Sequence, residues 1–146
     1  MKKFRFRLQT VLDVANTREM LALEEFAAVT QKVSTERTTL QNLLRELDYT
    51  RNIAYMGNLF ELKMKASYSV VLQKQIELSR LRLIKLEKEM EIKRLELVEK
   101  MRDRQLLENL KGKAWIKYKK EAEREEQLFL DEIGVTHFSR KEGESL

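Results

Sequence analysis

The chain has 146 residues, of which 36% are charged, and its 29 Lys and Arg against 24 Asp and Glu give a formal net charge of +5. It has no proline, no cysteine and four glycines, which leaves too few turn residues for a loop-rich domain and no thiol for a disulfide or a Cys-based metal, haem or redox site. These features favour one all-α domain of long helices. The single histidine, His137, cannot form a histidine cluster.

A membrane span or a secretory leader is not expected. The longest apolar runs, such as residues 26–29, are far shorter than the roughly 20 residues that a span requires. The basic opening, residues 1–7, is not followed by an apolar core, as it would be in a secretory leader. We therefore expect a protein of the cytosol, or one peripheral to a membrane.

The first third of the chain predicts a helix over about residues 4–56. Apolar side chains recur there in alternating steps of four and three residues, which is the heptad spacing of a coiled coil. Of the fourteen positions, only Glu19, Glu36 and Thr50 are polar. The apolar positions of this first seam are Leu8, Leu12, Ala15, Ala22, Phe26, Val29, Val33, Leu40, Leu43, Leu47 and Ala54.

A turn is predicted at residues 57–58. Gly57 suits a left-handed helix end, and Asn58 can cap the helix that follows. So short a connection makes the second helix, about residues 59–133, antiparallel to the first. Folding at Gly57 places Phe4 opposite about Leu110, and residues 134–146 are expected to form a frayed, polar tail.

The second helix carries two apolar stripes on opposite sides. Its seam comprises Leu72, Ile76, Ser79, Leu83, Leu86, Met90, Leu97 and Met101. The other stripe either packs within a splayed or rotated arm, or buries against another protein, because a monomeric hairpin needs only one apolar stripe per helix. This second stripe comprises Leu81, Ile84, Ile92, Leu95, Leu106 and Leu110.

Aromatic and basic side chains gather in two regions. Tyr49, Tyr55, Phe60 and Tyr68 flank the turn, where they either seal it or form a docking surface. Two basic blocks lie at the same end of the folded hairpin, and they point to a partner with acidic surfaces. One block is Lys2, Lys3, Arg5 and Arg7, beside Phe4 and Phe6, and the other is Lys111, Lys113, Lys117, Lys119 and Lys120, beside Trp115.

Nothing in the sequence indicates catalysis. It has no Gly-rich phosphate loop and no Ser/His/Asp grouping, so we expect no enzyme activity, no cofactor, no metal site and no small-molecule substrate. The many glutamates are expected on a solvated face, in ion pairs such as Glu89–Lys93 and Glu96–Lys100. The acidic run 121–126 offsets the basic block that precedes it, so nucleic acid is not the expected partner.

The opening residues 4–13, Phe-Arg-Phe-Arg-Leu-Gln-Thr-Val-Leu-Asp, followed by Arg18-Glu19 and Glu24-Glu25, carry a resemblance to a known family. They resemble the FliJ family of flagellar export proteins, many of which begin with the pattern F-x-F-R-L-x-x-V-L. The closing residues 130–133 and 138–141 are similar to the acidic, aliphatic and then basic ending of that family. The resemblance spans the whole chain.

The resemblance implies an antiparallel two-helix coiled coil, similar to the rotor stalk of F- and V-type ATPases, with both chain ends at one tip. It also implies cytoplasmic partners at the inner face of the cell membrane, beneath the flagellar basal body. These are the hexameric flagellar export ATPase, the cytoplasmic domain of the export-gate membrane protein and the export chaperones that the protein recycles. The candidate ATPase-ring contacts are Lys2, Lys3, Phe4, Arg5, Phe6, Arg7, Lys113, Trp115, Lys117, Lys119 and Lys120.

The gate or another partner is expected to contact the turn region and the second stripe. Leu72 and Ile76 fit both this role and the internal seam. The candidate contacts are Tyr49, Tyr55, Phe60, Tyr68, Leu72, Ile76, Leu81, Ile84, Ile92 and Leu95. Two alternatives stay open: the equivalent stalk of a virulence type III secretion system, and a basic coiled-coil binder of nucleic acid.

Overall fold

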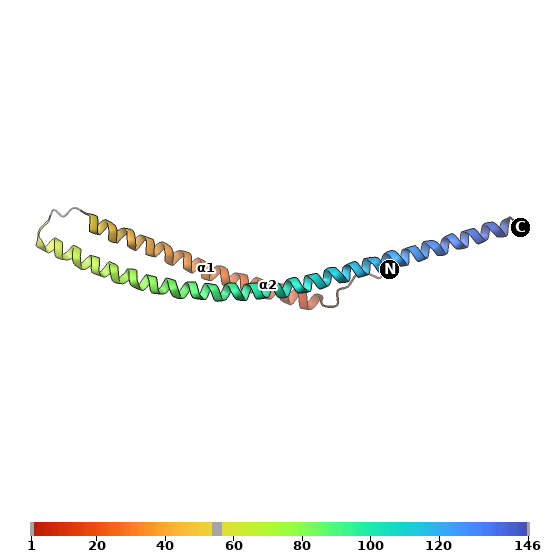
Figure 1. Cartoon of the computed structure of the whole chain (residues 1–146), viewed down its shortest axis with the longest axis horizontal. Helices are drawn as coiled ribbons and strands as arrows, with labels where there is room; N and C mark the ends of the chain where they lie inside the picture. Colours follow the sequence, from red (N-terminus) through yellow and green to blue (C-terminus); the bar gives the residue numbers. More distant parts are fainter. Residues whose placement is uncertain (1, 54–56, 146) are drawn as a thin grey trace. The chain divides into compact units, whose positions relative to one another are not determined.

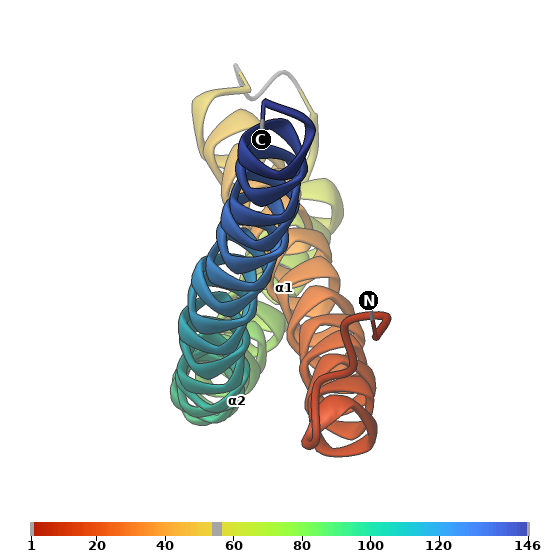
Figure 2. The ribbon, with the colours of Figure 1, turned by 90° about the vertical axis from the view of Figure 1, so that its right-hand side faces the viewer.

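The computed structural model describes residues 2–53 and 57–145 and contains two helices, α1 (Gln9–Asn52) and α2 (Leu59–Glu144). Helix makes up 92% of the described residues, and no strand occurs among them. The helices run in opposite directions and pack against each other (Figures 1 and 2), so the predicted all-α hairpin is confirmed. Residues 18–100 form one compact unit, and residues 2–17 with 101–145 form another.

The unit of residues 18–100 is held together by the predicted heptad seam. Val33 of α1 is only 2% exposed, and so is Leu72 of α2. Leu47, Leu72 and Ile76 form a buried cluster against which Leu40 and Leu43 pack. The 4–3 spacing holds because it keeps one face of each helix turned toward the other over many turns.

Polar side chains in this seam are satisfied. The buried Ser79 hydroxyl donates a hydrogen bond to Glu36 Oε1 at 2.6 Å, across the two helices. The buried Thr50 hydroxyl donates to the Glu46 carbonyl oxygen at 2.8 Å within α1. A polar group buried without a partner would cost about 1–3 kcal/mol, so these bonds allow the seam to carry Glu36 and Thr50 among its apolar residues.

Polar contacts between side chains of α1 and α2 help to fix the antiparallel register of this unit. Arg37 pairs with Glu87 at 3.1 Å, and the Tyr68 hydroxyl donates to a Glu46 carboxylate oxygen. Lys93 pairs with Glu25 at 3.1 Å across the helices and with Glu96 at 3.4 Å, instead of with the predicted Glu89. The cross-helix partner wins because Lys93 itself lies in the α2 seam, half-buried and directed at α1.

Of the two residues predicted to form the turn, Asn58 has its predicted role and Gly57 does not. α1 ends at Asn52, so Gly57 is not the residue that closes it, and Ala54 lies outside the described residues. The Lys65 ammonium donates to the Ile53 carbonyl at 3.0 Å and satisfies an acceptor there without a glycine cap. The predicted cap of α2 is confirmed, because the Glu61 backbone N–H donates to Asn58 Oδ1 at 3.0 Å.

In the second unit, the start of α1 lies five residues later than predicted. Residues 4–6 are not helical, as Figure 2 shows for the chain before α1, and the first turn begins at Gln9. Leu8 is consequently 37% exposed, whereas Leu12 and Ala15 are buried. Aromatic contacts made by Phe4 hold this segment out of the helix; they are described in the next subsection.

The predicted frayed tail is wrong, because α2 continues without interruption to Glu144. Gly112 and Gly134 lie inside the helix, with nothing within 4 Å of the position that a Cβ would take. A single glycine weakens a helix by only about 1 kcal/mol relative to alanine, and the sequence contains no proline that would end the helix. Composition alone therefore overstated the fraying.

Candidate functional site

Three aromatic rings bring the opening residues onto α2. The Phe4 ring meets the Trp115 ring edge-on at 5.1 Å and the Tyr118 ring at 5.3 Å, and the rings of Trp115 and Tyr118 stack at 5.6 Å. The Tyr118 hydroxyl also donates to the Lys2 carbonyl at 2.6 Å. Trp115 and Tyr118 are three residues apart, so both point from one side of α2 and form a platform for Phe4.

Exposed cations surround this aromatic cluster. The contacts of Phe4 and Lys2 with α2 confirm that the two basic blocks lie together. Phe4 contacts Trp115, however, and not the predicted Leu110. The chain before Gln9 is extended, and an extended chain reaches farther than a helix of the same length. Phe6 is half-buried, and Trp115 is 48% exposed. The exposed cations are Lys2, Lys3, Arg5, Arg7, Lys113, Lys117, Lys119 and Lys120.

A hollow of about 810 Å³ beside this cluster is lined by the opening residues and by α2. Its walls combine cations with two carboxylates, Glu121 and Glu125, one turn apart on α2. The lining therefore carries charges of both signs. The lining residues are Lys2, Lys3, Phe4, Arg5, Ala114, Lys117, Tyr118, Glu121, Ala122 and Glu125.

Sequence reasoning did not select Tyr118 as a site residue, although it holds this cluster together. Its spacing of three residues from Trp115 was the available signal. Bulky aromatic side chains at such spacing on a mostly polar helix indicate a shared contact surface.

The aromatic side chains near the turn are exposed. Tyr49 is 70% exposed, Phe60 is 68% exposed and Tyr68 is 43% exposed, so each presents part of its ring at the surface. Tyr55 lies outside the described residues.

The structure separates the candidate contacts of α2 into core and surface. Leu72 and Ile76 are 2% and 4% exposed, which corrects their assignment as partner contacts: they belong to the seam. Every member of the second stripe lies on the outside of α2, which removes the alternative that this stripe packs within the arm. The exposed members are Leu81, Ile84, Ile92, Leu95, Leu106 and Leu110.

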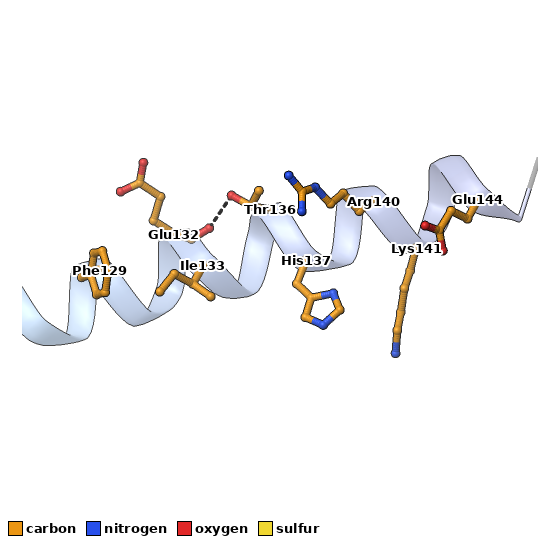
Figure 3. A pocket seen from close by; sticks show the side chains of 8 residues that line it. All are labelled: Phe129, Glu132, Ile133, Thr136, His137, Arg140, Lys141 and Glu144. Carbon is orange, nitrogen blue, oxygen red and sulfur yellow. Dashed lines mark hydrogen bonds between the residues drawn. The ribbon is translucent and has the colours of Figure 1, made fainter.

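The last turns of α2 carry a further exposed face. The sequence analysis did not predict it, because these residues were expected to form a frayed tail. Phe129 and Ile133 are 61% and 48% exposed, and His137 follows one turn later (Figure 3). The Thr136 hydroxyl donates a hydrogen bond to the Glu132 carbonyl at 2.8 Å, within the helix. The sequence feature that could have indicated this face is the recurrence of large side chains every four residues, at Phe129, Ile133 and His137.

The titratable groups with shifted pKa values belong to ion pairs on the surface. Hydrogen bonds to Glu25 and Glu96 raise the pKa of the Lys93 ammonium, and the hydrogen bond from Arg94 lowers the pKa of the Glu91 carboxyl. Between residues 2 and 53 and between 57 and 145, no three His, Asp or Glu gather as they would around a metal ion. Over the same ranges, neither helix is apolar enough to cross a bilayer.

Together, the long antiparallel helices and their exposed cationic, aromatic and aliphatic surfaces define an α-helical hairpin of the coiled-coil class. The sequence model of the family described as Flagellar FliJ protein matches residues 4–143, and the chain belongs to this family. The protein is thus related to flagellar and type III export, and its family is a non-enzymatic part of that system. Comparisons with curated proteins and with solved structures gave no match.

Proposed function

We propose that this chain couples the hexameric flagellar export ATPase to the export gate, by docking and without chemistry of its own. Membership of the FliJ family supports the setting, and the cationic aromatic cluster carries the proposal. Aromatic side chains supply large contact area at little entropic cost, and clustered cations attract acidic surfaces from a distance. The ATPase ring is the proposed partner of residues 2–7 and 113–120.

The exposed face around Phe129 and Ile133 extends this proposal along α2. Arg140 and Lys141 lie on the same face, so it repeats the combination of aromatic, aliphatic and cationic side chains found near Trp115. We assign it to the same partner.

The turn region is the proposed contact for the cytoplasmic domain of the export gate. Tyr49, Phe60 and Tyr68 are exposed there, and each offers a ring to a partner. Recycling of export chaperones, and a location in the cytoplasm at the inner face of the membrane beneath the basal body, belong to the same proposal, and membership of the family supports them.

The test is stimulation of ATP hydrolysis by the purified export ATPase. Reversing Lys2, Lys3, Arg5 and Arg7 to Glu should raise the protein concentration needed for half-maximal stimulation by about tenfold or more, because steering by clustered charge contributes that much to association. A matched variant reverses four exposed cations outside the cluster, Lys32, Lys63, Lys74 and Arg102, and should stimulate normally. Equal stimulation by both variants, with helicity intact by circular dichroism, would refute the docking assignment.

A further inference from the structure

Residues 2–6, which precede α1, form an extended segment that we call the strap. None of these residues is helical, and their exposure alternates. Phe4 and Phe6 are half-buried. Lys3 and Arg5, which alternate with them, are exposed. Side chains of an extended chain point alternately to its two sides. In a helix, residues two positions apart lie about 200° apart around the axis, so the extended form is the one that separates the rings from the cations.

Tyr118 and Phe4 attach the strap to α2. The Tyr118 hydroxyl donates a hydrogen bond to the Lys2 carbonyl at 2.6 Å, which fixes the backbone at one end of the strap. The Phe4 ring contacts the rings of Trp115 and Tyr118, with centroid distances of 5.1 and 5.3 Å. These contacts use backbone and aromatic groups, so the ammonium and guanidinium groups of the strap take no part in them.

A turn attaches the other end of the strap to α1. The Gln9 backbone N–H donates a hydrogen bond to the Phe6 carbonyl at 3.1 Å, and α1 begins at Gln9. Arg5 therefore lies between two fixed points, which are the ring contacts of Phe4 and this turn. Moving the cations of the strap away from α2 requires that the contacts of Phe4 and Tyr118 break.

The attached strap adds its cations to one from α2. Three cations of the strap and one of α2 line the hollow beside the aromatic cluster. Glu121 and Glu125 line it as well, but within residues 2–53 and 57–145 no ion pair of 4.0 Å or less joins a carboxylate to any of these cations. The four charges are thus available to an acidic surface. They are Lys2, Lys3, Arg5 and Lys117.

We propose that Tyr118 and Phe4 are positioning residues, which hold the strap on α2 so that the four cations meet an acidic partner as one preformed surface. This inference deepens the docking proposed above and rests on it. A free segment loses conformational entropy when a partner orders it, whereas the attached strap is ordered before binding. Association is therefore tighter with the strap attached, although the charge of the chain is the same in both states.

Exposure separates the roles of the three rings. Phe4 and Tyr118 are half-buried and contact each other, and the Tyr118 hydroxyl is already bonded to the strap. Trp115 is 48% exposed and is the ring of the cluster most open to a partner. We expect Trp115 to contact the ATPase and the other two rings to act through the strap.

A covalent link tests positioning without changing charge. Phe4→Cys combined with Ala114→Cys places one thiol on the strap and one on α2, since both residues line the hollow and the chain has no native cysteine. Two forms of this variant are compared: one joined by a short bismaleimide, and one capped at both thiols with N-ethylmaleimide. In the capped form, the concentration needed for half-maximal ATPase stimulation should rise about tenfold, because the strap is free. The link should restore the wild-type concentration, and maximal stimulation should be the same for both forms.

Three outcomes would overturn the inference. A linked form as weak as the capped form would mean that the Phe4 ring contacts the partner itself. A capped form as effective as the wild type would mean that the strap needs no attachment. A loss of maximal stimulation without a change in the half-maximal concentration would place Phe4 in a step after docking.

Conservative substitution of Tyr118 gives an independent measurement. Tyr118→Phe keeps the ring and removes the hydrogen bond to the Lys2 carbonyl, whereas Tyr118→Leu removes both. We expect the half-maximal concentration to rise about threefold for Tyr118→Phe and about tenfold for Tyr118→Leu, with helix content unchanged by circular dichroism. Equal concentrations for Tyr118→Leu and the wild type would contradict the positioning role.

Charge reversal of the opening residues, described above, separates this inference from the docking proposal. If the reversal weakens stimulation while the linked and capped forms are equal, docking stands and positioning fails. If the reversal has no effect, the docking proposal fails and the positioning role falls with it.

Discussion

Leu72→Ala is the sharpest test of the division between core and surface on α2. The side chain is 2% exposed and packs with Leu47 and Ile76, so truncation removes buried methyl groups and leaves a cavity. Comparable substitutions cost about 2–5 kcal/mol, and a core only two helices thick can relax, so we expect a loss of about 2–3 kcal/mol in the free energy of unfolding.

The matched control is Leu23→Ala. Leu23 is 52% exposed in the same unit, so the substitution makes the same change in helix propensity without opening a cavity. Surface changes of this kind usually stay within about 0.5 kcal/mol. Urea unfolding followed by circular dichroism measures both variants.

The two variants discriminate between the two roles considered for Leu72. A larger loss for Leu72→Ala than for Leu23→Ala supports the seam. Equal small losses would contradict it and would return Leu72 to the surface as a partner contact.

Two further predictions concern the aromatic cluster and the ion pairs. Phe4→Ala should shift the fluorescence emission of Trp115, the only tryptophan, to longer wavelength because its ring loses a neighbour, while helix content stays the same; unchanged emission would refute the ring contact. The pairing of Lys93 raises its pKa, so its contribution to stability is present below the ordinary value of 10.5 and is lost as pH rises through the raised pKa. Lys93→Met should remove this alkaline loss, measured as the thermal midpoint across the alkaline range, and an unaltered profile would assign the loss to other groups.

Much of the fold follows from sequence because the heptad seam is a repeated, local signal. Consistent spacing over many turns outweighs single polar exceptions, and Glu36 is accommodated by a hydrogen bond from Ser79 that no pattern on one helix could reveal. The cap at Asn58 was predictable for the same reason: it depends on residues within one turn.

The errors came from features that depend on distant contacts. The start of α1 at Gln9 reflects the docking of Phe4 on Trp115 and Tyr118, which lie more than a hundred residues away in the chain. The extent of α2 beyond Gly134 reflects a balance in which one glycine is too weak to end a long helix.

The candidate site was only partly predictable. The two basic blocks were found as clusters in the sequence, but the choice between core and surface for Leu72 and Ile76 required burial.

The hydrogen bond between Ser79 and Glu36 has a mechanical consequence. If α2 slid along α1 by one heptad in either direction, the Glu36 carboxylate would face Leu72 or Leu86 in place of a hydroxyl, and an unpartnered carboxylate against leucine is costly. The bond therefore opposes sliding of one helix along the other, so a force or torque applied to one helix is transmitted to the other.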